Sequence, residues 1–311
     1  MVELVDTYVR GAYAERRGGS SPPLGTNQKF LTMKTRNLFL ISAVIFIALL
    51  FIIPRSFIPT ELGNTILTVV AFLFGIIAGF YIVVTTTDYN SVKSILATET
   101  AGWISLHQNV LIYDKKIAEK LALLIDAYIR RAFDFEIIDY AKSTNDEFEP
   151  IKELVRELSF KEKLSPIYEK IRNIMDDEII TSRQQLTVLG AKTLSVFQWA
   201  ILLALASIFT FSLYGLRTGE LFFDIVTVAI SSSIILVLLL IRDLDLYIWN
   251  EKTFGYDIFE NVLKSIGELP YYPTESIEQG RVQPHDKEYR IGTYINFPKS
   301  IDRKIEVKRT G

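Results

Sequence analysis

Residues 62–86 read LGNTILTVVAFLFGIIAGFYIVVTT and contain no charged side chain. A helix that crosses the hydrocarbon core of a bilayer needs about 20 mostly apolar residues. Residues 38–53, 194–216 and 221–241 have the same character, with Asp224 the one charge among them. Helices on the surface of a soluble protein carry a polar face instead. The sequence therefore predicts four transmembrane helices.

The predicted spans pair into two hairpins, since only residues 54–61 and 217–220 separate the members of each pair. Basic residues flank one side of the spans and are sparse on the other, which places both termini and the long middle region in the cytoplasm. We expect an all-α, multi-pass protein of the inner membrane. Its predicted parts are a first hairpin (33–86), a helical cytoplasmic region (87–193), a second hairpin (194–241) and a cytoplasmic C-terminal helix and tail (242–311). The basic flank consists of Lys34, Arg36, Lys93, Arg183, Lys192, Arg242 and Lys252, against Arg55 and Arg217 on the other side.

Residues 1–32 lack apolar periodicity and are rich in Gly, Arg, Ser and Pro. The pieces GSSP and MVELVDT can be back-translated into segments that resemble the T-arm and the D-arm of a tRNA gene. This predicts a read-through of such a gene, with the native start at Met33. The alternative is a disordered N-terminal tail.

The cytoplasmic parts have helical periodicity. Apolar residues recur at steps of three and four through residues 90–141, which predicts one helix with a break near Asn109, or two in sequence. Ser165 and Pro166 are typical of a helix start, and that helix is expected to run into the third span. A helix is predicted at 256–266. Residues 288–297 and 304–309 alternate like short strands, but an extended tail fits equally.

The composition excludes several functional classes. The chain has no cysteine, so disulfides and thiolate sites are absent. A net charge of −2 argues against a nucleic-acid partner. Phosphate-binding and HExxH motifs are missing, and the two histidines, His107 and His285, stand alone. We therefore expect no enzymatic activity.

Ionisable residues next to the spans are the candidate functional groups. Glu99, Arg183, Arg242, Asp243 and Asp245 are expected to form a charge cluster in the cytoplasmic layer at the membrane. The cluster would fasten helices together; alternatively, Asp243 and Asp245 would hold Ca²⁺. No calcium-loop pattern accompanies them, which favours fastening, and no other metal or cofactor is expected.

Asp224 is predicted about one turn inside the outer end of the fourth span. A charge at that depth is energetically costly unless it is solvated by water or paired with an opposite charge. It is either a residue of an outer pore mouth or a shallow side chain that reaches water.

Three stretches together resemble the uncharacterised bacterial bestrophin-like family, a distant relative of the bestrophin ion channels. They are GFYIVVTTTDYNSVKSILATETAGW after the second span, IITSRQQLTVLGAKTLSVFQWAILL entering the third, and LLLIRDLDLYIWNEKTFGYDIFENVL leaving the fourth. The resemblance covers roughly residues 38–268. The family often continues from its D-L-D into an Arg-Pro-Phe-Gly-like turn, which this chain lacks, so no turn is carried over to residues 246–255.

The resemblance implies several protomers around one pore, lined by the second span and gated by dewetting of an apolar constriction. The implied pore-lining residues are Phe72, Ile76, Gly79 and Val83. It also implies that the D-L-D aspartates clamp the fourth helix to cytoplasmic helices, with Arg183 as their candidate partner. The expected partners are the lipid bilayer, further copies of the chain and small inorganic ions.

Two functional hypotheses follow. The first is an oligomeric channel for small anions or monovalent cations, favoured by the three glycines and the threonines at the exit of the second span. The second is a membrane-anchored scaffold or sensor whose cytoplasmic helices bind a partner, favoured by the lack of a strong ring of charges within the spans.

Overall fold

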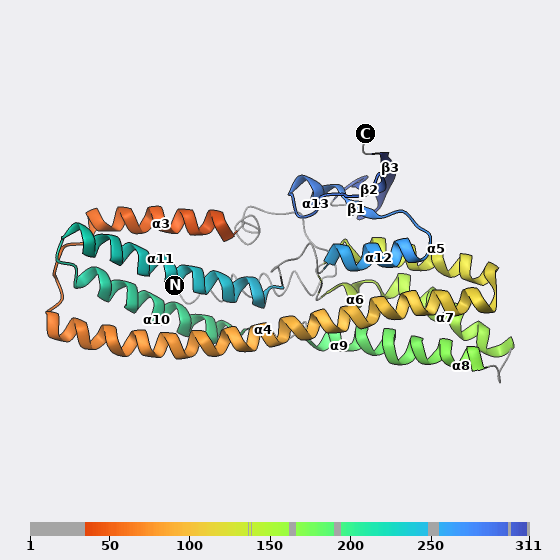
Figure 1. Ribbon diagram of the computed structural model, residues 1–311, viewed down its shortest axis with the longest axis horizontal. Helices are drawn as coiled ribbons and strands as arrows, with labels where there is room; N and C mark the ends of the chain where they lie inside the picture. Colours follow the sequence, from red (N-terminus) through yellow and green to blue (C-terminus); the bar gives the residue numbers. More distant parts are fainter. Residues whose placement is uncertain are drawn as a thin grey trace. The chain divides into compact units, whose positions relative to one another are not determined.

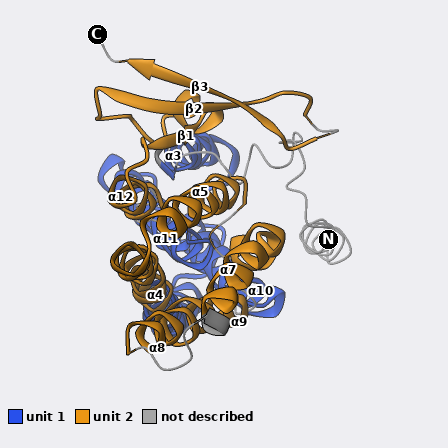
Figure 2. Ribbon diagram, turned by 90° about the vertical axis from the view of Figure 1, so that its right-hand side faces the viewer, with its two compact units in different colours: residues 1–12, 24–89, 193–249 blue, residues 13–23, 90–192, 250–311 orange. Residues whose placement is uncertain are grey.

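The computed structural model describes residues 35–135, 137, 139–161, 166–189, 194–247, 255–297 and 300–309. They belong to two compact units, which Figure 2 colours separately. Unit 1 holds the described residues of Leu24–Tyr89 and Thr193–Trp249, and unit 2 those of Asn90–Lys192 and Asn250–Gly311. Helices dominate both units (Figure 1), as expected. The predicted extension 1–32 and the predicted start at Met33 lie outside the described residues.

Unit 1 is a bundle of apolar helices. It contains α3 (Thr35–Ile52), the part of α4 (Thr60–Tyr113) up to Tyr89, α10 (Val196–Gly215) and α11 (Leu221–Asp245). One face of α4 packs against α10 and α11, and α11 packs against α3. The buried core consists of Phe74, Ala78 and Tyr81 of α4, Leu202 and Ala206 of α10, and Ile234, Leu238 and Ile241 of α11.

Three of the predicted spans, α4, α10 and α11, are long and apolar enough to cross a membrane by their length and composition. Helix α3 is also apolar, but the stretch Asn37–Ile52 is shorter than the others. The 18 residues of α3 measure about 27 Å at 1.5 Å per residue, against a hydrocarbon core of about 30 Å. The chain is thus a mostly helical membrane protein, and the number of four spans stays a prediction.

The loops that close the two helix hairpins of unit 1 pack on each other. The amide of Ser56 donates to the carbonyl of Arg217 at 3.1 Å. Gly219 has φ +89°, and a Cβ atom there would lie 2.7 Å from the side chain of Arg55. Any other residue would be strained at this positive φ, so glycine is favoured at the end of the bundle where α4 and α11 begin.

The helices of the regions predicted to be cytoplasmic fill unit 2. Helix α4 ends at Tyr113, and Asp114 starts α5 (Lys115–Ala132) by accepting from the amide of Lys116 at 2.7 Å. The break therefore lies at Asp114 and not near Asn109, because the Asp114 carboxylate caps the new helix. The other helices are α6 (Tyr140–Ser143), α7 (Asn145–Lys161), α8 (Pro166–Asn173), the π-helix η1 (Ile174–Ile180), α9 (Thr181–Leu189) and α12 (Asp257–Ser265).

The expected run of one helix into the third span is wrong. Helix α10 has its own start, where the amide of Ser195 donates to Oε1 of Gln198 at 2.7 Å and Oγ of Ser195 accepts from the amide of Gln198 at 3.3 Å. This capping box defines a helix N-terminus, so α9 and α10 are separate elements. The predicted N-cap Ser165 lies outside the described residues.

Unit 2 also contains a three-stranded sheet, which confirms the strand interpretation of the tail. Strand β1 (Tyr271–Pro273) pairs parallel with β2 (Glu288–Tyr294), and β2 pairs antiparallel with β3 (Arg303–Arg309). The short helix α13 (Thr274–Glu278) follows β1. Arg290 and Arg303 bind Asp126 and Asp134 of the α5 region at 2.6 and 2.7 Å, which anchors the sheet to the helices.

Candidate functional site

The four predicted pore-lining residues share one exposed face of α4. Phe72, Ile76 and Val83 are 68%, 54% and 65% exposed. At Gly79 a Cβ atom would meet nothing within 4 Å. Steps of three and four residues keep these positions on one side of the helix, opposite the buried core positions. A single protomer therefore presents an uncovered apolar face between residues 72 and 83.

Asp224 forms an ion pair in unit 1. Its Oδ1 lies 3.3 Å from Nε of Arg217, whose side chain is 1% exposed, and Nη2 of Arg217 donates to the carbonyl of Ile53 at 2.9 Å. The pair links the N-terminal turn of α11 to both loops of the bundle. Neither this partner nor its burial was predicted from the sequence. The role of Asp224 at a pore mouth stays a prediction.

The two aspartates at the end of α11 bind different neighbours in unit 1. Asp243 accepts from the hydroxyl of Thr35 on α3 and from Nη2 of Arg242 at 2.6 Å. Asp245 accepts from the amide of Leu194 at 2.8 Å, next to the start of α10. The carboxylates thus tie α3 and the start of α10 to the foot of α11. The clamp to the cytoplasmic helices that the resemblance implied stays a prediction.

Calcium binding at these aspartates stays a prediction. In the described part of the chain, no group of three or more His, Asp or Glu side chains is arranged to hold a metal ion. The hydrogen bonds from Thr35, Arg242 and Leu194 occupy carboxylate oxygens that an ion would need.

Glu99 is the centre of a buried polar network in unit 2. Its carboxylate is fully buried and accepts from Nε1 of Trp103 at 3.2 Å, from the hydroxyl of Tyr128 at 2.6 Å and from the hydroxyl of Tyr140. Burial, followed by the charge of Glu99, raises the pKa of Tyr128 well above its ordinary value, so this phenol stays a proton donor. Three donors thus compensate one buried carboxylate.

Arg183 completes this network. Its Nη1 donates to the hydroxyl of Tyr128 at 2.5 Å and to Thr144 at 3.1 Å, and its Nη2 donates to Asn145 at 3.0 Å. The guanidinium lies 4.1 Å from the centre of the Phe148 ring. Tyr128 therefore bridges Arg183 to Glu99, and the network joins α4, α5, α6, α7 and α9.

The predicted cluster of five charges appears as two groups of contacts, one in each unit. Glu99 and Arg183 share the network of unit 2, whereas Arg242 and Asp243 pair in unit 1. Sequence reasoning missed Tyr128, Tyr140 and Trp103. The spacing of Glu99 and Trp103, four residues apart on one helix, was the available signal.

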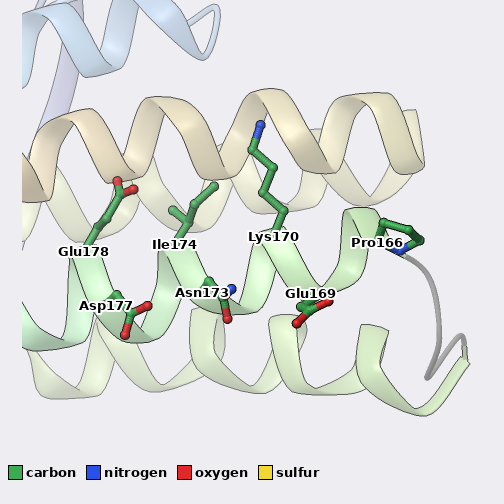
Figure 3. Close-up of a pocket in the computed structure, with 7 residues that line it drawn as sticks. All are labelled: Pro166, Glu169, Lys170, Asn173, Ile174, Asp177 and Glu178. Carbon is green, nitrogen blue, oxygen red and sulfur yellow. The ribbon is translucent and has the colours of Figure 1, made fainter.

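A groove of about 360 Å³ runs along α8 and η1. Figure 3 shows that Lys170, Ile174 and Glu178 point toward the neighbouring helix, while Asp177 and Glu169 point away from it. These charged side chains diverge, whereas the polar groups of a small-molecule site usually converge on the ligand.

The comparisons with known proteins agree with this architecture. The bestrophin-like domain matches residues 37–246, which is more than half of the chain. A comparison with curated proteins found no match.

The chain is also similar to solved structures. For a bacterial bestrophin homologue from Klebsiella pneumoniae, the TM-score is 0.54 at 14% identity, over 76% of this chain and 100% of that chain. For a tryptophan-to-alanine variant of the homologue from the same organism it is 0.57 at 14% identity, over 76% and 99%. For a proline-to-alanine variant of a membrane protein it is 0.56 at 15% identity, over 76% and 100%. These likenesses support the fold, and the domain match over the four apolar helices shows that the chain belongs to the bestrophin-like family.

Proposed function

We propose that the protein is a homo-oligomeric channel for small inorganic ions, with the exposed face of α4 lining the pore. The observation that carries the proposal is the uncovered face formed by Phe72, Ile76, Gly79 and Val83. Facing copies of it would form an apolar constriction, which gates ions by dewetting.

Polar side chains on the same helix support a pore rather than a purely lipid-facing surface. Thr65 and Thr68 lie toward the beginning of α4 and are exposed. Thr87 lies beyond the apolar segment and is also exposed. Polar side chains within a span tend to face a protein interior or water. A polar–apolar–polar order along one face is expected of a pore with a narrow apolar middle.

The proposed location is the inner membrane, with both termini and the residues of unit 2 in the cytoplasm. This follows from the distribution of Lys and Arg around the apolar helices. The networks of Glu99 and of the two aspartates then hold the helices in place. The proposal includes no catalytic step.

The test is ion flux through liposomes that contain purified protein, with Phe72→Ala and Ile76→Ala combined in one variant. We expect the variant to conduct faster, because smaller side chains widen the constriction and let water enter. Ile225→Ala on α11 is the matched control, since Ile225 is 59% exposed but lies on another helix. It should conduct like the wild type.

The size of the complex in detergent is the second readout, and a ring of protomers is expected. A monomer that conducts no ions in either form would contradict the proposal. That result would favour the scaffold or sensor hypothesis, in which the helices of unit 2 bind a partner.

A further inference from the structure

Glu61 lies on the same face of α4 as the proposed constriction. Glu61, Phe72 and Val83 are spaced by eleven residues, which is three turns of an α-helix plus about 20°. Glu61 therefore points in nearly the same direction as Phe72, roughly 17 Å closer to the beginning of the helix at 1.5 Å per residue. Any arrangement of copies that directs Phe72 at a common axis also directs Glu61 toward it.

The Glu61 carboxylate is available to an ion. Glu61 is exposed, and its side chain makes no ion pair with any described residue. From Thr60 to Val83, helix α4 contains no lysine or arginine. The basic residues at this end lie on the loops instead: Arg55 lies against Gly219, and Arg217 pairs with Asp224. No positive charge in this part of α4 offsets Glu61.

Thr65 and Thr68 follow Glu61 along α4 and, like its carboxylate, present oxygen atoms with free lone pairs. The hydroxyl of Thr65 donates to the carbonyl of Glu61 at 2.9 Å, and that of Thr68 donates to the carbonyl of Asn64 at 2.8 Å. A hydroxyl has one proton, so each of these side chains offers only lone pairs to a passing ion. Lone pairs and a carboxylate coordinate cations, and they provide no hydrogen for an anion.

We propose that Glu61 forms a ring of carboxylates at the outer mouth of the pore, backed by the oxygens of Thr65 and Thr68, and that it makes the channel selective for small monovalent cations. This inference rests on the proposed function and adds the class of ion and the residue that selects it. Glu61 in the first turn also stabilises the helix dipole, but that role alone leaves ion selectivity unchanged.

The expected effect follows from the charge. One carboxylate about 8 Å from an ion in water changes its local concentration about twofold, and a ring multiplies this factor. The effect falls with ionic strength, since the Debye length shrinks from about 30 Å at 0.01 M to about 3 Å at 1 M salt.

The test is the reversal potential of the full-length protein in planar bilayers under a KCl gradient, measured for the wild type and Glu61→Gln. The wild type should prefer K⁺ over Cl⁻. At low salt, Glu61→Gln should lower the K⁺/Cl⁻ permeability ratio by a factor of about two or more. This difference should vanish near 1 M KCl. Glu220→Gln is the matched control, because Glu220 is an exposed carboxylate at the start of α11 and not on α4. It should keep the ratio of the wild type.

Three results would overturn the inference while leaving a channel in place: a wild type that prefers Cl⁻, a Glu61→Gln ratio equal to that of the wild type at low salt, or an equal shift in Glu220→Gln. The absence of current in every variant, with protein inserted, would instead refute the proposed function and this inference with it.

Discussion

Tyr128 connects the two charged groups of the network in unit 2, and removing its hydroxyl tests whether that network stabilises the protein. The hydroxyl donates to Oε1 of Glu99 at 2.6 Å and accepts from Nη1 of Arg183 at 2.5 Å. The substitution Tyr128→Phe deletes both hydrogen bonds. It leaves the ring in place, where it packs 5.1 Å from the ring of Trp103.

The magnitude follows from the charges of the two partners. Hydrogen bonds to charged groups contribute about 1.5–3 kcal/mol each. Glu99 keeps Trp103 and Tyr140 as donors, and Arg183 keeps Thr144 and Asn145 as acceptors, so neither charge is left unpaired. We therefore expect a loss of about 2–4 kcal/mol in the free energy of unfolding. For a chain of 311 residues, this corresponds to a fall in Tm of roughly 3–6 °C.

Thermal unfolding in detergent, followed by tryptophan fluorescence, measures this change, and Trp103 lies inside the network. Tyr113→Phe is the control, since the Tyr113 hydroxyl makes no hydrogen bond with any described residue. It should leave the Tm within about 1–2 °C of the wild type. Equal Tm values for Tyr128→Phe and the wild type would refute the view that this network holds the helices of unit 2 together.

Two further predictions concern unit 2. Gly102→Val should lower the free energy of unfolding by about 1–3 kcal/mol, because a Cβ at Gly102 would lie 2.9 Å from the side chain of Ile179. Ala97→Val, at an exposed site of the same helix, is the control and should cost much less. Equal losses of stability in thermal unfolding would contradict the close packing of Gly102 against Ile179. Burial raises the pKa of Asp134 above its ordinary value of 3.8 against the opposing charge of Arg303, so the folded state holds this proton more tightly than the unfolded state does. This contribution to stability is fully present below about pH 4 and is lost as the pH rises through the folded pKa of Asp134. The Tm of the wild type should therefore fall over this pH range, and the Tm of Asp134→Asn should not show this fall. Parallel profiles of Tm against pH for the two proteins would refute the prediction.

The apolar helices and the exposed face of α4 were predictable because they are properties of local sequence. A charge-free run that is long enough to cross a bilayer as a helix has few other structural interpretations. The positions of Phe72 and Val83 on one face follow from helical geometry.

The network around Glu99 was not predictable, because it depends on which helices are neighbours. Tyr128 and Tyr140 lie 29 and 41 positions from Glu99 along the chain, and their approach is decided by packing in unit 2. For the same reason the sequence suggested the wrong neighbours for Arg183, which binds Tyr128, and left Asp224 without its partner, Arg217.

The absence of cysteine from the chain permits a direct test of the pore, because a single introduced thiol is the only reactive one. Val83→Cys places it on the exposed face of α4, and Leu203→Cys places it on α10, where Leu203 is 51% exposed. Ion flux through liposomes is then measured before and after a cationic, water-soluble thiol reagent. The account predicts that the reagent blocks flux through Val83→Cys and leaves flux through Leu203→Cys unchanged. Unaltered flux through Val83→Cys, with labelling of its thiol verified by mass, would contradict a pore lined by α4.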